Sequence, residues 1–235
     1  MKTFEELKED LLERAKKHHA YQDGYSMGLN AKSKQDLLKA ITDNWHWVLR
    51  TSKMIDANYL EENFTEEELT EAGIYTRKEH TSNAKSFACG SATVKAYGSA
   101  TVKAYGSATV KACDSATVKA YDSATVEACG SATVEAYGSA TVEAYDSATV
   151  EAYGSATVEA YDSATVEAYG SATVEAYDSA TVKAYDSATV KAYDNSYVED
   201  CTGNINTVSD HGIVKDYYNH KIYIKKGKFE IIEIK

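Results

Sequence analysis

The chain has 235 residues, contains no proline and carries a formal net charge of −11 at pH 7. No stretch approaches the roughly 18 apolar residues that a membrane-spanning helix needs. Residues 1–7 are polar and lack the apolar core of a secretory signal peptide. We therefore expect a cytoplasmic protein that makes no contact with a membrane.

Residues 1–80 are predicted to form a small helical domain. Three hydroxyl residues each stand three positions ahead of a carboxylate, as in a capping box, and this predicts the start of three helices. The pairs are Thr3 with Glu6, Ser33 with Asp36, and Thr65 with Glu68. The second helix, roughly residues 34–50, carries apolar residues three and four positions apart that form one stripe. The third helix is short, and Gly73 stands where a left-handed residue would end it.

The second predicted helix contains Trp45, His46 and Trp47. Trp45 fits the apolar stripe, whereas Trp47 points elsewhere and is expected to pack on the first coil of the repeats or on a partner. The same domain holds one dense polar set, His18 and His19 with Glu13 or Asp23, on which any enzymatic activity would depend. We expect no catalytic residue, metal site or cofactor, because the sequence has no nucleophilic triad, phosphate-binding loop or ligand cluster.

Residues 90–193 repeat one octapeptide thirteen times, Gly/Asp-Ser-Ala-Thr-Val-Lys/Glu-Ala-Tyr. Ala, Val and Ala alternate with Thr, Lys/Glu and Tyr, a period of two that is typical of a β-strand with a small apolar face. The Gly/Asp-Ser step is the corner, where glycine tolerates positive φ and Asp or Ser can bond its own backbone. Nearly identical octads favour a parallel solenoid over a series of hairpins. The absence of proline agrees, because each rung needs backbone donors.

The corner residues indicate how many octads make one coil. If two octads do, every sixteenth residue stacks, and the corners sort into one column with five Asp and another with two. Three octads per coil give no such sorting and enclose a cavity that Ala and Val are too small to fill. We therefore predict a mainly β protein, in which a thin two-sheet solenoid at residues 81–201 follows the helical domain at residues 1–80.

A capping segment, residues 202–235, is predicted to close the last coil, because an open coil would expose backbone and apolar interior. Residues 221–235 resemble a β-hairpin that turns at Gly227. Its strands would carry Ile222 and Ile224 on one side of the turn and Phe229, Ile231 and Ile234 on the other.

The sixth position of the octad changes sign in blocks of four Lys, seven Glu and two Lys. One interpretation is a solvated face that keeps the solenoid in solution. The other is an acidic band read by a partner, because like charges one rung apart repel and mixed signs would serve solubility without that repulsion. The candidate binding residues of the acidic band are Glu127, Glu135, Glu143, Glu151, Glu159, Glu167, Glu175, Asp146, Asp162 and Asp178.

The eighth position is expected to stack tyrosines along the edge of the coil. All four cysteines, Cys89, Cys113, Cys129 and Cys201, occupy this position. Their spacing indicates neither a zinc site nor a disulfide framework, and we expect reduced thiols.

The run Ala-Tyr-Gly-Ser-Ala-Thr-Val resembles the octads of bacterial ice-nucleation proteins. It is still more similar to uncharacterised octapeptide-repeat β-solenoids that have a short helical N-terminal domain and are encoded by gut bacteria and their phages. The resemblance covers about 110 residues and implies the solenoid architecture. Ice-nucleating repeats have paired Thr rows, whereas here a single Thr is followed by Val and a charged residue.

Three functions follow as hypotheses. Residues 90–201 hold 6 Lys against 8 Glu and 8 Asp, and so carry −10 of the net charge of −11. Over about seven coils of ~4.8 Å this is about half the axial charge density of duplex DNA, which argues against direct binding to nucleic acid. The leading hypothesis is a non-catalytic interaction or scaffold protein that presents an acidic repeat surface to a protein partner, with a homodimer as one form of assembly. The first alternative is a DNA-mimic inhibitor of the anti-restriction or anti-CRISPR type, which is encoded by a phage or mobile element and binds a nucleic-acid enzyme. The second alternative is an ice-binding solenoid.

Overall fold

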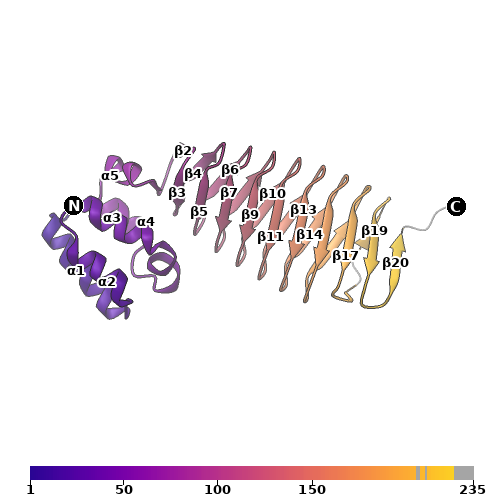
Figure 1. Cartoon of the computed structure of the whole chain (residues 1–235), viewed down its shortest axis with the longest axis horizontal. Coiled ribbons are helices and arrows are strands. Elements are labelled where there is room, and N and C mark those ends of the chain that lie inside the picture. Colours follow the sequence, from indigo (N-terminus) through magenta and orange to yellow (C-terminus); the bar gives the residue numbers. More distant parts are fainter. Residues whose placement is uncertain (205–206, 210, 225–235) are drawn as a thin grey trace. The chain divides into compact units, whose positions relative to one another are not determined.

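The computed structural model describes residues 1–204, 207–209 and 211–224. The chain forms two compact units, residues 1–126 and residues 127–235. Each unit contains short parallel strands that alternate between two sheets, so that two octads make one coil (Figure 1). The predicted mainly β fold, a parallel solenoid of octapeptide repeats with an N-terminal helical domain, is confirmed.

The helices of the described residues lie in the first unit. They are α1 (Phe4–Lys17), α2 (Gln22–Asn30), α3 (Lys34–Asp43), the π-helical turn η1 (Trp47–Thr51), α4 (Ala57–Asn63) and α5 (Glu66–Glu71). Thr3 and Thr65 form complete capping boxes with Glu6 and Glu68, as predicted. Ser33 caps α3, but the capping box is incomplete, because Asp36 accepts the backbone N–H of Lys32 at 2.8 Å.

The second predicted helix is interrupted. Helix α3 ends at Asp43, and η1 follows after a short break. Ser52 Oγ donates to the carbonyls of Trp47 and Val48 at 2.8 and 3.2 Å, in addition to the backbone N–H groups of Ser52 and Met54 that these carbonyls accept.

Helices α2 and α4 were not predicted. The residue that caps α2, Tyr21, makes no side-chain bond to the helix, and Gly24 and Gly28 lower its helix propensity. Helix α4 does begin at a side-chain cap, Asp56, but no Glu or Gln follows three residues later to complete a capping box.

In the first unit the strands start directly after α5. Gly73 has φ of +69° and ends the helical segment as predicted, and β1 already begins at Ile74, within the range expected to be helical. One sheet contains β1 (Ile74–Tyr75), β3 (Lys85–Ala88), β5 (Thr101–Ala104) and β7 (Thr117–Ala120), and the other contains β2 (Glu79–Ser82), β4 (Thr93–Ala96) and β6 (Thr109–Ala112). Strand β8 (Thr125–Ala128) spans the boundary between the units.

The second unit continues the same alternation of strands. One sheet contains β9 (Thr133–Ala136), β11 (Thr149–Ala152), β13 (Thr165–Ala168), β15 (Thr181–Ala184), β17 (Tyr197–Asp200), β19 (Ile213–Asp216) and β20 (Lys221–Ile224), and the other contains β10 (Thr141–Ala144), β12 (Thr157–Ala160), β14 (Thr173–Ala176), β16 (Thr189–Ala192) and β18 (Thr207–Val208). Below, these are called the odd and even sheets. Val150 pairs with Val166, and Val142 with Val158, so in these parallel pairs each residue lies opposite the residue sixteen positions later.

The interior of the coil consists of the third, fifth and seventh octad positions. In the octad that contains Val158, this valine and its neighbours Ala156 and Ala160 are all 0% exposed. The corner residue has positive φ throughout, for example +54° at Asp162 and +70° at Gly154. The next residue donates its backbone N–H to the carbonyl of the corner below, as Ser163 does to Asp146 at 2.9 Å. Small interior side chains therefore allow the two sheets to approach closely.

The C-terminal cap is a hairpin, but it forms earlier in the sequence than predicted. Strand β20 pairs antiparallel with β19, with Ile213 opposite Ile224, and the chain turns at residues 217–220. The predicted turn at Gly227 and the return strand with Phe229, Ile231 and Ile234 lie outside the described residues.

The cysteines differ from the expectation of reduced thiols in part. Cys89 and Cys201 are free, the former buried and the latter exposed. Cys113 and Cys129 are disulfide-bonded. In the described part of the chain, every helix is too short or too polar to span a bilayer.

Candidate functional site: the outward columns of the repeat

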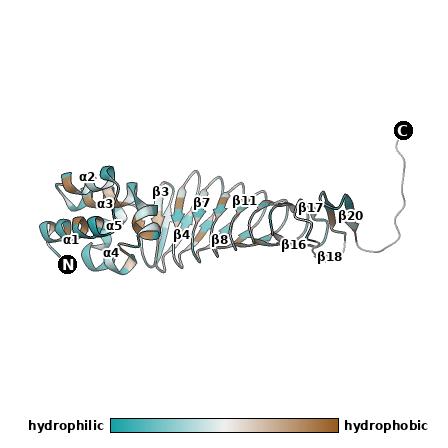
Figure 2. Ribbon diagram, turned by 90° about the horizontal axis from the view of Figure 1, so that it is seen from below, coloured by the Kyte–Doolittle hydropathy of each residue, from teal (hydrophilic) through white to brown (hydrophobic). Residues whose placement is uncertain are grey.

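Three columns of side chains cover the outer face of each sheet, because the fourth, sixth and eighth octad positions alternate with the buried ones. They hold Thr, Lys or Glu, and Tyr. Hydrophilic and hydrophobic residues accordingly alternate along the strands near β7 and β8 (Figure 2). Each column contains identical groups at the spacing of hydrogen-bonded strands, about 4.8 Å.

The seven glutamates of the predicted acidic band divide between the two sheets. On the odd sheet, Glu135, Glu151 and Glu167 lie in register. On the even sheet, Glu143, Glu159 and Glu175 lie in register, and Glu127 holds the same position on β8, the strand next to β10. The structure therefore does not assemble one band. It makes two glutamate columns, one on each sheet of the second unit.

Each described glutamate from 135 to 175 accepts a hydrogen bond from the tyrosine two residues later. The phenol donates to Oε2 in every case, at 2.5 to 2.9 Å. The donors are Tyr137, Tyr145, Tyr153, Tyr161, Tyr169 and Tyr177. These bonds were not predicted, although residues two apart on a strand share a face and the spacing of Glu and Tyr in the octad therefore indicates them.

The hydrogen bonds change the acidity of the phenols. The bond to Glu143, followed by partial burial, raises the pKa of Tyr145 to about 12. The corresponding bonds raise the pKa of Tyr153 and Tyr177 to about 12 as well. A carboxylate that accepts from a phenol stabilises the neutral phenol, so each pair shares one proton and one negative charge.

The tyrosines also stack along the edges of the coil, as predicted. Tyr137, Tyr153, Tyr169 and Tyr185 form one ladder, with ring centroids 4.9 to 5.0 Å apart and ring planes within 10° of parallel. Tyr145, Tyr161, Tyr177 and Tyr193 form the other, with centroids 4.9 to 5.0 Å apart and planes within 8°. We call these the odd and even tyrosine ladders. Their rings fix the phenols that hold the glutamates.

Lysines end both glutamate columns. Lys191 lies in register with Glu175 and donates to its Oε1 at 2.7 Å, while Tyr177 occupies Oε2. The lysine and the tyrosine, in that order, hold the pKa of Glu175 below its usual value. On the odd sheet, Lys183 lies in register with Glu167. The like-charge repulsion of the columns is thus reduced by phenols along their length and by lysines at their C-terminal ends.

The three aspartates of the acidic band have a different role. Asp146, Asp162 and Asp178 lie in one corner column, and each carboxylate accepts the backbone N–H of the corner residue sixteen positions earlier, at 2.9 to 3.2 Å. Asp tolerates the left-handed conformation better than other residues with a Cβ. These aspartates therefore stabilise the turn, and they lie at the corner rather than in a glutamate column.

In the first unit, the helical segment docks on the first coils through Trp45 and His46, not through Trp47. Trp45 is 1% exposed and packs against Phe87 with ring centroids 4.9 Å apart. His46 Nδ1 is 2.9 Å from Tyr105 Oη, and burial, followed by nearby cations, lowers the pKa of His46. The expectation that Trp47 packs on the first coil is wrong, because the π-helical turn directs this side chain back toward the helices.

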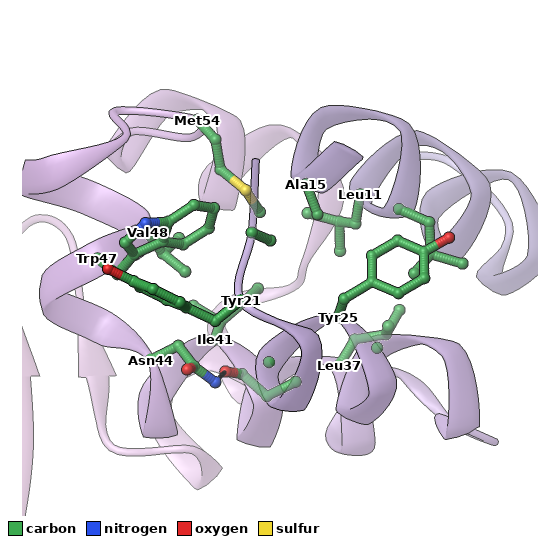
Figure 3. A pocket seen from close by; sticks show the side chains of 15 residues that line it. Leu11, Ala15, Tyr21, Tyr25, Leu37, Ile41, Asn44, Trp47, Val48 and Met54 are labelled. Carbon is green, nitrogen blue, oxygen red and sulfur yellow. Dashed lines mark hydrogen bonds between the residues drawn. The ribbon is translucent and has the colours of Figure 1, made fainter. Parts of the chain in front are cut away.

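Trp47 lines an apolar cavity among the helices, opposite Tyr21, whose ring centroid is 6.5 Å away (Figure 3). Leu11, Ile41 and Met54 complete its walls. The cavity volume is about 50 Å³, far below the roughly 300 Å³ of a small-molecule site. It is room for a few water molecules at most, so we assign it to imperfect packing around α2.

The polar set on which an enzyme would depend is not assembled into a site. His18 caps the end of α1 with its backbone N–H, and His19 follows with φ of +57°. Among the described contacts, no hydrogen bond joins the side chains of His18, His19, Glu13 and Asp23.

The terminal hairpin exposes apolar side chains. Ile213, Ile222 and Ile224 are 40%, 66% and 45% exposed, at outward positions that elsewhere hold Thr or a charged residue. The homodimer is predicted to form through this last coil or through one of the flat sheets. Dimerisation stays a prediction.

Comparison with known proteins found no match: no family model fits the chain, and neither the curated proteins nor the solved structures include one that is significantly similar.

Proposed function

We propose that this chain is a non-catalytic interaction protein that presents columns of fixed carboxylates to a basic protein partner. The observation that carries the proposal is the row of tyrosine–glutamate hydrogen bonds. A solvated glutamate on an exposed strand would lose side-chain freedom when it bound a partner. Here Oε2 is already fixed by a phenol, and the described contacts of Glu151, Glu159 and Glu167 leave Oε1 without a partner in the protein.

Such preorganised acceptors favour lysine and arginine. A carboxylate oxygen that is fixed before binding loses little entropy when it accepts a charge-assisted hydrogen bond. The tyrosine rings beside the column add apolar area with limited freedom, a feature of protein interfaces. The combination of acceptor and ring supports a cationic partner surface that lies along the column.

The split into two columns favours this function over the DNA mimic. On one face, carboxylates follow one another at about 4.8 Å, roughly a third of the axial charge density of duplex DNA at one charge per ~1.7 Å. The corner aspartates lie outside these columns, at the edge of the coil, and so add no charge to the column on either face. A groove adapted to duplex DNA would therefore meet too few charges on either face. The ice-binding alternative requires a regular hydroxyl lattice, and here each Thr column lies beside a charged column.

The test removes charge from one face at a time. The variant Glu135→Gln/Glu151→Gln/Glu167→Gln alters the odd sheet, and Glu143→Gln/Glu159→Gln/Glu175→Gln is its matched control on the even sheet. Proteins captured from a bacterial lysate by the wild-type chain are identified and then offered in purified form to both variants. We expect binding of a basic partner to weaken at least tenfold with one triple and to remain with the other, because a partner contacts one face.

Undiminished binding to both triples contradicts the proposal. Duplex DNA added as a competitor tests the DNA-mimic hypothesis. If DNA displaces captured nucleic-acid enzymes from the chain, and both triple variants bind these enzymes equally weakly, the DNA-mimic function replaces the proposed one. Growth of ice in dilute protein tests the third hypothesis separately, since an ice-binding surface changes the habit of the crystal.

A further inference from the structure

The tyrosine ladders place phenols in two uninterrupted rows on the second unit. In each row four nearly parallel rings follow one another with centroids 4.9 to 5.0 Å apart. This separation is typical of offset-stacked aromatic pairs, so each ring lies directly beside the next one along the row. Packing accounts for the stacking itself. It does not account for the second feature of these rows, which is a base on nearly every phenol.

The base is the glutamate of the same octad. Tyr153 and Tyr169 donate to Glu151 and Glu167 at 2.6 Å, within the reach that proton transfer to a positioned base requires. The even ladder repeats the arrangement, with Tyr177 donating to Glu175 at 2.7 Å. Tyr185 differs, because the residue two positions earlier is Lys183.

We propose that each tyrosine ladder is a relay for one-electron oxidation, in which the glutamates accept the phenol protons. A one-electron oxidant, such as an oxidised metal complex or a peroxyl radical, removes one electron from a ladder tyrosine. The phenol O–H bond breaks in the same step, and its proton moves to Oε2 of the partner glutamate. The products are a neutral phenoxyl radical, a protonated carboxyl group and the reduced oxidant, so charge and protons balance.

The oxidised position then moves along the ladder. The next tyrosine gives an electron to the first phenoxyl radical and its own proton to its own glutamate, while the first glutamate returns its proton to the first phenol. Electrons travel between rings and protons stay within pairs. Loss of a phenol proton to a fixed carboxylate is favourable because the bare radical cation is a far stronger acid than the phenol. The relay thus spreads damage over several rings instead of leaving it at the point of attack.

Cys201 provides the place at which to start the relay. It occupies the tyrosine position one coil beyond Tyr185, with its backbone N–H bonded to the carbonyl of Ala184 at 2.9 Å. It is free and exposed, whereas burial raises the pKa of the Cys89 thiol to about 12, and Cys113 and Cys129 are disulfide-bonded. A thiol-reactive ruthenium polypyridyl complex therefore labels the full chain at the end of the odd ladder.

The experiment oxidises the label with a laser flash and an external electron acceptor, and follows the absorbance of the phenoxyl radical. Tyr217→Phe and Tyr185→Phe are present throughout, because Tyr217 lies on the other side of Cys201 and Tyr185 has a lysine, not a glutamate, two residues earlier. Tyr169, which donates to Glu167, is then the first ladder phenol that the label can oxidise. Glu151→Gln/Glu167→Gln keeps the shape of the side chains but removes the base, and we expect the radical to form at least about tenfold more slowly. Glu143→Gln/Glu159→Gln makes the same change in the even ladder, and we expect no change in the rate.

A further variant separates the relay from a purely local effect. Tyr169→Phe keeps the stacked ring but removes a phenol, and we expect the yield of radical beyond this position to fall by most of its amplitude. Equal rates in the odd and even glutamate variants, or a radical yield unaffected by Tyr169→Phe, would overturn the proposal. Circular dichroism of each variant checks that the solenoid is intact, and the even-ladder variant controls for any loss of structure from two Glu→Gln changes.

Discussion

The corner aspartates offer the sharpest test of the fold, because two substitutions remove the same charge but treat the backbone differently. Asp146, Asp162 and Asp178 have φ of +56°, +54° and +51°. Replacing all three by alanine places a Cβ without a polar group in the left-handed region, which costs about 1 to 2 kcal/mol per residue. Alanine also restricts the unfolded chain relative to glycine, which returns about 0.4 to 1 kcal/mol per residue. The net penalty of the alanine triple over the glycine triple is therefore about 2 kcal/mol.

The assay is urea unfolding followed by circular dichroism, with the triple Asp→Gly variant as the reference. Both variants lose three carboxylates, so electrostatics and the hydrogen bonds to the preceding coil cancel from the comparison. Amide hydrogen exchange adds a second readout: the N–H of Gly130, which donates to Asp146 at 2.9 Å, should exchange faster in both triples than in the wild type. Equal stability of the two triples would refute the left-handed corner, and unchanged exchange at Gly130 would refute the role of the carboxylate.

Three further predictions follow from the interior, the phenols and the helical segment. Val158→Ala removes two methyl groups from the column of interior valines, which are 0% exposed, and should lower the free energy of unfolding by ~2 kcal/mol in the same urea assay. Its control, Thr157→Ala on the outer face, should change that free energy by under ~0.5 kcal/mol. The hydrogen bond to Glu151 raises the pKa of Tyr153 to about 12, so the stabilisation that the neutral phenol gives the folded chain is complete below about pH 10, the usual tyrosine pKa, and is lost as the pH rises through about 12. In Glu151→Gln, an ultraviolet titration should show the pKa of Tyr153 shifted back toward 10. Trp45→Ala should cost about 3 to 5 kcal/mol, and Trp45→Phe much less, because the buried indole N–H has no hydrogen-bond partner among the described residues; thermal unfolding of both variants measures the difference.

The octad determined the fold almost completely, and the reason is physical. An even period of eight returns the same residues to the same face, and the sorting of Asp and Gly at the corners predicts a coil of sixteen residues. The elements that were not predicted, helices α2 and α4, lie outside the repeats, where no repeated pattern supports a prediction. Helix α2 begins without a side-chain cap and contains Gly24 and Gly28, so local propensity opposes it and tertiary packing must hold it.

The candidate site was harder to predict than the fold. Counting charges along the sequence merged two columns into one band, because a list of glutamates every eight residues does not show that consecutive ones belong to different sheets. The corner aspartates were included for their charge, although their position before Ser already marked them as turn residues. The phenol–carboxylate bonds were within reach of sequence reasoning, since Glu151 and Tyr153 share a face, but only the structure shows that the phenol bends toward Oε2.

The repeat separates the residues that determine the fold from those that determine the surface. Coils with Lys at the sixth position and coils with Glu use the same register, as the pairs Val94–Val110 and Val142–Val158 show, and valine is fully buried in both. The side chain at the sixth position can therefore change from negative to positive without a change in the interior. The change removes a phenol–carboxylate hydrogen bond, and like charges on neighbouring strands repel each other in either case. Charge variants of the outer columns should fold as the wild type does. A loss of binding in them then reports on the surface itself, and this makes the face-by-face exchange of Glu for Gln a decisive experiment on this protein.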